Sequence, residues 1–455
     1  MTERAVRRIS VVLCLATGTI AGWAAVSAVP LAVGLLGALV LLTAPASLLM
    51  AAAVIMGHGF TIPSLQAGLV GPLLATDILL LVWLTRTVLR KHHDAATPFA
   101  RANLLLVGFL GWALLATIYV GGTVTPLLRI AVYAAVFMAL SRYGVNKRHI
   151  YFMVLLYALV NITGGLVQGQ TRLVGLDIGD PAQLGAVILA ALVPILAGDM
   201  KFRGQWLVVV ALFGGIWMTQ TRGIWFATIV VLAVWAQRRL SAGKVVALIM
   251  VLAVVGFQVV GRVTEALGLN PASRDYRAES IEEGIRSGLA QPIFGSGWAT
   301  VDLVDAQGRP MVSDEFVVPY NLLINVFTSV GTLGVVLLLL WLVALLRLLT
   351  PSRGAPLLFV TAFLALSVTE MTLYAGSTLT VLFFIYAGIG VNDELMRRRT
   401  DVAESVVLEL RGVAVRTDQS VPPRGVSHRT LASTTPAALF NVAVTLVPSL
   451  VPSMK

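Results

Sequence analysis

The chain has 455 residues, of which 58% are hydrophobic and only 12% are charged, and its formal net charge is +11. Soluble globular domains carry about 25% charged residues, so this composition excludes an ordinary soluble protein and indicates a helical membrane protein. The positive charge does not indicate a nucleic-acid partner, because the basic residues form short clusters between apolar runs, where the orientation signals of membrane proteins occur.

Apolar runs of helix-spanning length recur along the whole sequence, which predicts an all-α polytopic membrane protein with roughly 12 to 14 transmembrane helices and one long extracytoplasmic loop. Residues 1–10 resemble the basic region of a signal peptide, but no small-residue cleavage site precedes the next apolar run, so we expect an uncleaved first helix. In chain order the candidate spans are residues 9–28, 30–44, 46–58, 70–88, 101–121, 124–141, 149–168, 182–198, 205–220, 222–236, 245–261, 321–346, 355–372 and 376–391.

The span 205–236 is the strongest test of this layout. One helix of that length would be about 48 Å long, well beyond a hydrocarbon core of about 30 Å. It would also place Arg222 near the bilayer centre, at a cost of about 2.5–3.5 kcal/mol. The sequence therefore predicts two short helices that meet at residues 219–223.

The basic clusters predict the orientation. With fourteen spans, every cluster between the apolar runs falls on one side of the membrane, which the positive-inside rule makes the cytoplasmic side. Both termini are then cytoplasmic in a multi-pass membrane protein. The loops at residues 169–181, 219–222, 262–320 and 373–376 face outward.

This layout predicts five regions. Residues 1–100 are N-terminal transmembrane helices, and residues 101–261 form a transmembrane core. Residues 262–320 form the extracytoplasmic loop with a short amphipathic helix. Residues 321–391 are C-terminal transmembrane helices, and residues 392–455 are expected to be a mostly disordered cytoplasmic tail.

The amphipathic helix of the loop is expected from Asp275 to about Gly288. Asp275 suits its N-terminus. Arg277, Ile281, Ile285 and Leu289 recur every four residues and would share one face. Such a helix suits the bilayer surface, and the alternative is a helix that covers a bundle without any catalytic role.

Three arginines, Arg172, Arg222 and Arg277, are predicted on the outer face, each near a helix end. Guanidinium groups bind phosphate oxygens in pairs and stay charged, so the set suits a diphosphate. There are two alternatives. The Arg172 side chain simply extends to the membrane interface, or Arg222 binds the phosphate of a lipid headgroup. No histidine lies in the long loop, and we expect neither a metal nor a cofactor.

Short motifs along the chain resemble those of the O-antigen ligase and O-antigen polymerase-like membrane proteins of bacteria. The segment from Arg172 to Pro181 resembles the family's arginine–glycine–Asx–proline loop, and Thr221-Arg222-Gly223 resembles its Ser/Thr-Arg-Gly turn. The resemblance covers roughly residues 101–391 and is strongest over 165–335.

Two further motifs follow in the same order. Arg277, followed fifteen residues later by Pro292 and then by residues 294–297 (Phe-Gly-Ser-Gly), resembles the family's arginine and its Pro-Leu-x-Gly-x-Gly segment. Tyr320-Asn321, with Gly331 and Gly334 downstream, fits the spacing of the family's His-Asn helix entry and Gly-x-x-Gly.

The resemblance implies transfer of a glycan from a polyprenyl-diphosphate carrier at the outer face of the bacterial plasma membrane, without a metal or a nucleotide. A ligase passes the glycan to a lipid or protein acceptor, and a polymerase passes it to another lipid-linked glycan. By the same resemblance Arg172, Arg222 and Arg277 would hold the diphosphate, and other glycan-assembly membrane proteins are possible partners.

The sequence departs from the family at the His-Asn position, where it has Tyr320 before Asn321. A tyrosine with an ordinary pKa near 10 is a poor general base at neutral pH. Either Asp314 or Glu315 supplies the base, or Tyr320 positions a substrate. The change weakens the ligase interpretation more than the polymerase interpretation.

Two other functions fit the sequence. A transporter for a small anion or a lipid-linked sugar would use intramembrane ionisable residues, for which Asp77, Arg129 and Glu370 are the candidates. A non-catalytic partner in envelope glycan assembly would explain the loss of the histidine at Tyr320.

Overall fold

The computed structural model describes residues 75–91, 101–122, 124–175, 178, 180–237, 272–298, 321–352, 354–370, 372–373 and 377–419. Four predicted spans, 9–28, 30–44, 46–58 and 245–261, lie outside these residues. By its internal contacts the chain divides into two compact units, residues 1–398 and 399–455. The helix packing around the site belongs to the first unit.

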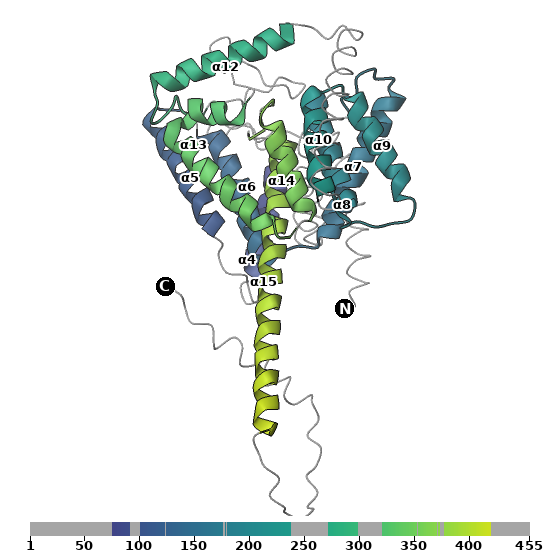
Figure 1. Ribbon diagram of the computed structural model, residues 1–455. Helices are drawn as coiled ribbons and strands as arrows, with labels where there is room; N and C mark the ends of the chain where they lie inside the picture. The colour runs from purple at the N-terminus through teal and green to yellow at the C-terminus, as the bar shows by residue number, and fades with distance from the viewer. Residues whose placement is uncertain are drawn as a thin grey trace, which may run out of the picture. The chain divides into compact units, whose positions relative to one another are not determined.

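All regular structure in the described residues is helical (Figure 1). The elements are α4 (Ala75–Lys91), α5 (Arg101–Tyr119), α6 (Thr125–Tyr143), α7 (Lys147–Val167), α8 (Pro181–Ala197), α9 (Gln205–Met218), α10 (Arg222–Gln237), α12 (Ala272–Ala290), α13 (Leu322–Leu349), α14 (Ala355–Leu366) and α15 (Thr378–Gln419).

Five of these helices are long and apolar enough to cross a membrane: Arg101–Tyr119, Pro126–Tyr143, Lys147–Val167, Leu322–Leu349 and Thr378–Ser405. Helices α8, α9, α10 and α14 are shorter and also apolar. The prediction of an all-α polytopic membrane protein is confirmed. The helical hairpin predicted within residues 205–236 is confirmed too, because α9 ends at Met218 and α10 begins at Arg222.

Helix α8 is the most deeply buried of the described helices, with every residue from Gln183 to Ile195 buried. It packs against α7, α9, α10 and α14. Small residues allow this close approach: a Cβ atom at Gly185 would lie 2.6 Å from the Ile224 side chain of α10. Close contacts of this kind between helices are typical of membrane proteins, where van der Waals packing replaces the hydrophobic driving force.

Helix α13 packs along α5 and bends at Val330 and Gly331, whose backbone angles are not helical. Gly331 has φ +70°, a backbone conformation that residues other than glycine rarely adopt. The bend leaves backbone groups without helical partners. The Trp112 indole of α5 donates one hydrogen bond to the Val330 carbonyl at 2.9 Å.

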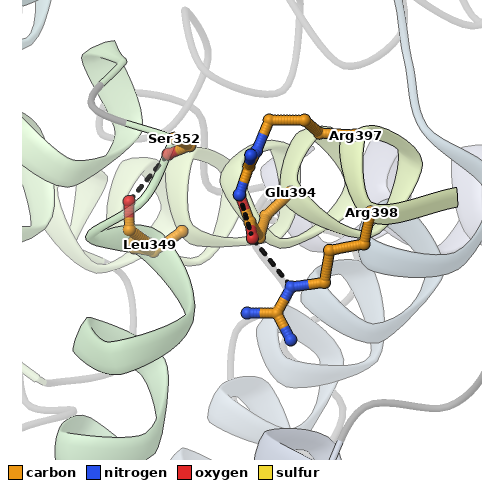
Figure 2. A network of polar contacts seen from close by, with 5 residues as sticks. All are labelled: Leu349, Ser352, Glu394, Arg397 and Arg398. Atoms are coloured by element: carbon orange, nitrogen blue, oxygen red, sulfur yellow. Dashed lines mark hydrogen bonds and ion pairs between the residues drawn. The ribbon is translucent and has the colours of Figure 1, made fainter. Parts of the chain in front are cut away.

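Helix α15 extends further than the sequence predicts, since the expected span ends at residue 391 and the helix continues to Gln419. Charge pairs one turn apart explain part of the difference (Figure 2): the buried Glu394 carboxylate accepts hydrogen bonds from Arg397 at 2.9–3.0 Å and from Arg398 at 2.8 Å. Pairs at this spacing stabilise a helix. Residues 392–419 belong to this helix, and the rest of the predicted tail lies outside the described residues.

Candidate functional site

The loop that carries Arg172 is bound directly to the turn between α9 and α10. The Leu173 amide donates to the Met218 carbonyl at 2.9 Å, and Arg172 Nε donates to the Thr219 carbonyl at 3.2 Å. In the other direction, the Gln220 side chain donates to the Thr171 carbonyl at 3.2 Å. Two motifs that are separated by 47 residues in the chain are thus brought together.

The turn itself is held in an unusual backbone conformation. Gln220 has φ +52°, and among the described residues it is the non-glycine residue with positive φ. Hydroxyl groups fix the turn on either side: Thr219 donates to the Ile216 carbonyl at 2.8 Å, and Thr221 donates to the Thr219 carbonyl at 3.2 Å. Strained backbone of this kind clusters at functional sites.

Arg222 is the first residue of α10 and its side chain is exposed. The first amides of a helix have no helical acceptor, and the helix dipole favours an anion at this end. Arg172 is also exposed and keeps most of its guanidinium nitrogens available beyond the bond from Nε. Arg172 is thus bound to Thr219, three residues before Arg222 and the N-terminus of α10, and two arginines beside a helix N-terminus suit a phosphate-bearing ligand.

Internal hydrogen bonds fix the Arg172 loop. The Gln170 side chain accepts a hydrogen bond from the Val174 amide at 2.9 Å and donates one to the Gly175 carbonyl at 3.0 Å. Gly175 has φ +86°, and a Cβ atom there would lie 2.6 Å from the Asn161 side chain of α7. At the end of the loop, Asp180 accepts a hydrogen bond from the Ala182 amide and caps α8.

The turn after α14, residues 367–370, connects this surface to the beginning of α13. Gly223 packs against it, since a Cβ atom at Gly223 would lie 2.5 Å from Thr369 Oγ1 and 3.3 Å from Glu370 Oε1. From the other side, the Asn321 amide group donates to the Val368 carbonyl at 3.2 Å, and the Leu322 amide donates to the Ser367 carbonyl at 2.9 Å. Asn321 and Gly223, the neighbour of Arg222, therefore contact the same turn.

The prediction from the sequence did not include this turn in the site. The sequence placed Glu370 inside a span as a transporter candidate, but α14 ends at Leu366 and Glu370 lies beyond it. A run of Ser, Thr and Glu at the end of an apolar helix was the available signal. Of the other transporter candidates, Arg129 is buried in α6, and Asp77 lies in α4 with its side chain outside the described residues.

Asn321 has a structural position that the sequence resemblance did not predict. Its side-chain oxygen accepts hydrogen bonds from the Leu323 amide at 3.0 Å and from the Ile324 amide at 3.2 Å, so it caps α13. Its neighbour Tyr320 and the predicted bases Asp314 and Glu315 lie outside the described residues.

Helix α12 carries Arg277 and lies against the first part of α13 (Figure 1). The predicted helix in the loop is thus confirmed, with wider bounds, and the Arg277 side chain lies outside the described residues. On this helix Ser280, Gly284 and Gly288 are buried, whereas Ile285 and Leu289 are 42% and 65% exposed. The small residues face α13, and this close approach lets the Thr328 hydroxyl of α13 donate to the Gly284 carbonyl at 2.8 Å.

The segment after α12, residues 291–298, docks onto the bend of α13. The Ser296 amide donates to the Thr328 carbonyl at 2.7 Å, and the Thr332 amide donates to the Pro292 carbonyl at 2.8 Å. Gly331 leaves room for the Ile293 carbonyl, which a Cβ atom would overlap. The glycines of this segment and of α13 therefore allow the two backbones to come into direct contact.

One stretch of the chain matches a known family, and it contains most of α9, all of α10 and α12, and the larger part of α13. Residues 207–341 match the family model described as O-Antigen ligase. The match includes Arg222, Arg277 and Asn321, whereas Arg172 precedes it. No curated protein is similar enough to match the chain.

Proposed function

We propose that this chain, an O-antigen ligase-like membrane protein, transfers or polymerises a glycan from a polyprenyl-diphosphate carrier at the outer face of the bacterial plasma membrane. The observation that carries the proposal is the docking of the Arg172 loop on the Arg222 turn through three hydrogen bonds. The family match supports glycan transfer in general, and the cationic surface supports a diphosphate as the recognised group.

In this proposal Arg172, Arg222 and Arg277 hold the diphosphate. An acceptor hydroxyl attacks the anomeric carbon, the bond from that carbon to the diphosphate oxygen breaks, and the bonding electrons leave with the polyprenyl diphosphate. The guanidinium groups stabilise the charge that develops on the leaving oxygen. The hydroxyl proton passes to a base, for which Asp314 and Glu315 are the sequence candidates, with Tyr320 as a positioning residue.

Asn321 is better placed to position than to react. Its side-chain oxygen and its amide group are both used by backbone partners. We therefore assign Asn321 the role of joining α13 to the turn that Gly223 contacts. A polymerase is favoured over a ligase, since the family's histidine is replaced by Tyr320.

The test replaces each arginine by alanine in cells that make the envelope glycan. Loss of one positioned cationic group at a developing charge reduces turnover by about 10²-fold or more. Arg222→Ala, Arg172→Ala and Arg277→Ala are each expected to remove polymer and to leave lipid-linked units in the membrane. Lysine in place of Arg222 retains the charge and loses the paired contact, so we expect only partial recovery.

Arg203→Ala is the matched control. Arg203 is an exposed arginine outside the helices, before the start of α9, whereas Arg222 follows the end of the same helix. The two positions are about 20 Å apart along α9. Normal glycan in Arg203→Ala and loss of glycan in Arg222→Ala support the proposal. Normal glycan in well-expressed variants of all three site arginines contradicts it.

A further inference from the structure

An open groove lies between the end of α5 and the segment that follows α12. Its volume is about 680 Å³. No charged side chain contributes to its lining, which separates it from the arginine surface. The lining residues are Tyr119, Val120, Gln291, Pro292, Ile293 and Phe294.

The walls of this groove are fixed by contacts on their far sides. The Phe294 ring lies between two aromatic rings, with centroids 5.1 Å from Trp112 and 4.4 Å from Tyr119. Just downstream, the Trp298 amide donates to the Thr117 hydroxyl of α5 at 3.2 Å. The groove is therefore formed before any ligand arrives, which lowers the cost of binding.

The chemistry of the lining fits a sugar ring. Tyr119 is 71% exposed although one face of its ring stacks on Phe294, so an aromatic surface stays accessible. Within the described part of the chain, the Tyr119 hydroxyl and the Gln291 side-chain amide make no hydrogen bond. A flat apolar ring beside free donors and acceptors matches a pyranose, which has apolar ring faces and hydroxyl edges. An acyl chain would leave both polar groups unused, and a phosphate would find no cation.

The position of the groove decides which sugar it meets. Arg277 and Ala290 are separated by about 20 Å along α12, and Gln291 follows directly. One sugar cannot reach both the diphosphate at Arg277 and the groove. A ligand that contacts both is an extended glycan.

We infer that this groove binds a sugar unit of the glycan chain remote from the diphosphate and thereby retains the growing polymer between transfers. The inference rests on the proposed function, because it assigns the groove to the substrate of the same site. It also names the residues that recognise the sugar: Tyr119 by stacking and Gln291 by hydrogen bonding.

The binding test uses the purified full-length protein and does not depend on transfer. The probe is lipid-free oligosaccharide, released by mild acid from the envelope glycan of the same cells and titrated by calorimetry. Tyr119→Ala is expected to weaken binding about three- to tenfold, the size of one aromatic contact. Gln291→Ala weakens it as well, and Tyr119→Trp retains it.

Ile118→Ala is the control, since Ile118 is 61% exposed beside Tyr119 and does not line the groove. Equal affinity of the wild-type protein and Tyr119→Ala, or absence of binding to the wild-type protein, overturns the inference. Binding that Ile118→Ala weakens as much as Tyr119→Ala also overturns it.

The cellular test separates this inference from the proposed function. Tyr119→Ala is expected to shorten the glycan without the accumulation of lipid-linked units that the arginine variants cause. If the glycan chains have an unchanged length distribution in Tyr119→Ala and are lost in Arg222→Ala, sugar binding in the groove is refuted and the glycan-transfer proposal stands. Oligosaccharide binding that depends on Tyr119, together with normal glycan in the alanine variants of all three site arginines, refutes the transfer proposal instead.

Discussion

Asn321 joins two elements through one side chain. Its oxygen caps α13 and its nitrogen binds the Val368 carbonyl. We predict that Asn321→Ala lowers the stability of the protein by about 1 kcal/mol, the usual cost of a lost N-cap. Asn321→Asp retains the cap and loses only the donor to Val368, so its loss is smaller.

Thermal unfolding of the purified variants measures this order, and glycan transfer is measured beside it. If Asn321 only positions elements, Asn321→Asp retains most of the transfer activity. Complete loss of transfer in a stably folded Asn321→Asp protein would instead indicate direct contact with the substrate.

Gly331 lies where α13 bends and where the Ile293 carbonyl of the preceding loop approaches. Alanine there must adopt φ +70° and ψ −172°, a region used almost only by glycine, which costs about 1–3 kcal/mol, and must also displace that carbonyl. We predict a loss of about 3 kcal/mol or more for Gly331→Ala, seen as a low folded yield in gel filtration. Gly108→Ala in α5 is the control, because nothing lies within 4 Å of its Cβ position and alanine favours the helix.

At this scale the sequence predicts which residues face outward and does not predict which of them meet. Arg172 and Arg222 shared a predicted face because basic clusters define the opposite one. The hydrogen bonds that join them run largely to backbone carbonyls, and these leave no pattern in the residue types. The capping role of Asn321 was within reach, since Asn before an apolar run is a known helix start.

Among the elements, the pairing of α5 with α13 depends on a polar contact as well as on apolar packing. The Trp112 indole donates to the Val330 carbonyl at the bend of α13. Trp112→Phe retains the stacking on Phe294 and removes this hydrogen bond, which we expect to cost about 0.5–1.5 kcal/mol.

Denaturation of the purified protein by heat checks this value. Trp206→Phe makes the same chemical change in α9 at a side chain that is 65% exposed. We expect Trp206→Phe to leave the unfolding temperature nearly unchanged. Equal effects of the two substitutions would show that the Trp112 hydrogen bond contributes nothing measurable.

In α15 the buried carboxylate of Glu394 faces two arginines that are about half exposed (Figure 2). Removal of both arginines leaves a buried charge without these partners, whereas Glu394→Gln removes the charge itself. We predict that the double variant Arg397→Ala/Arg398→Ala is less stable than Glu394→Gln. The loss stays below the about 3–5 kcal/mol of a fully buried pair, because water reaches the arginines. The reverse order in thermal unfolding would contradict this.

Helices were the most predictable elements. Hydropathy located α9 and α10 as a hairpin because a single helix would have buried Arg222. The end of α15 was not predictable from hydropathy, since the sequence beyond residue 391 is rich in charged residues, of which Glu394 pairs with Arg397 and Arg398 one turn away. The face of α12 that contacts α13 was not predicted, because it is formed by glycines, which allow close contact and leave no hydrophobic pattern in the sequence.

For the molecule as a whole, the orientation in the membrane is the prediction on which the location of the site depends. Thr171 and Lys201 are exposed and lie on the two sides of α8 in the chain. We predict that a membrane-impermeant maleimide labels Thr171→Cys in intact cells and labels Lys201→Cys only after permeabilisation, in a Cys14→Ser background. Labelling of Lys201→Cys alone in intact cells would place the arginines on the cytoplasmic side.

The bond between Trp112 and the Val330 carbonyl spans 218 residues of sequence. At a synthesis rate of about 5–20 residues per second, α5 leaves the ribosome roughly 10–40 s before its acceptor exists. During that interval the indole of α5 cannot donate to the Val330 carbonyl. The late arrival of α13 then completes the pair and the bend together, so ribosome pausing before residue 330 is expected to lower the yield of this protein more than pausing after it.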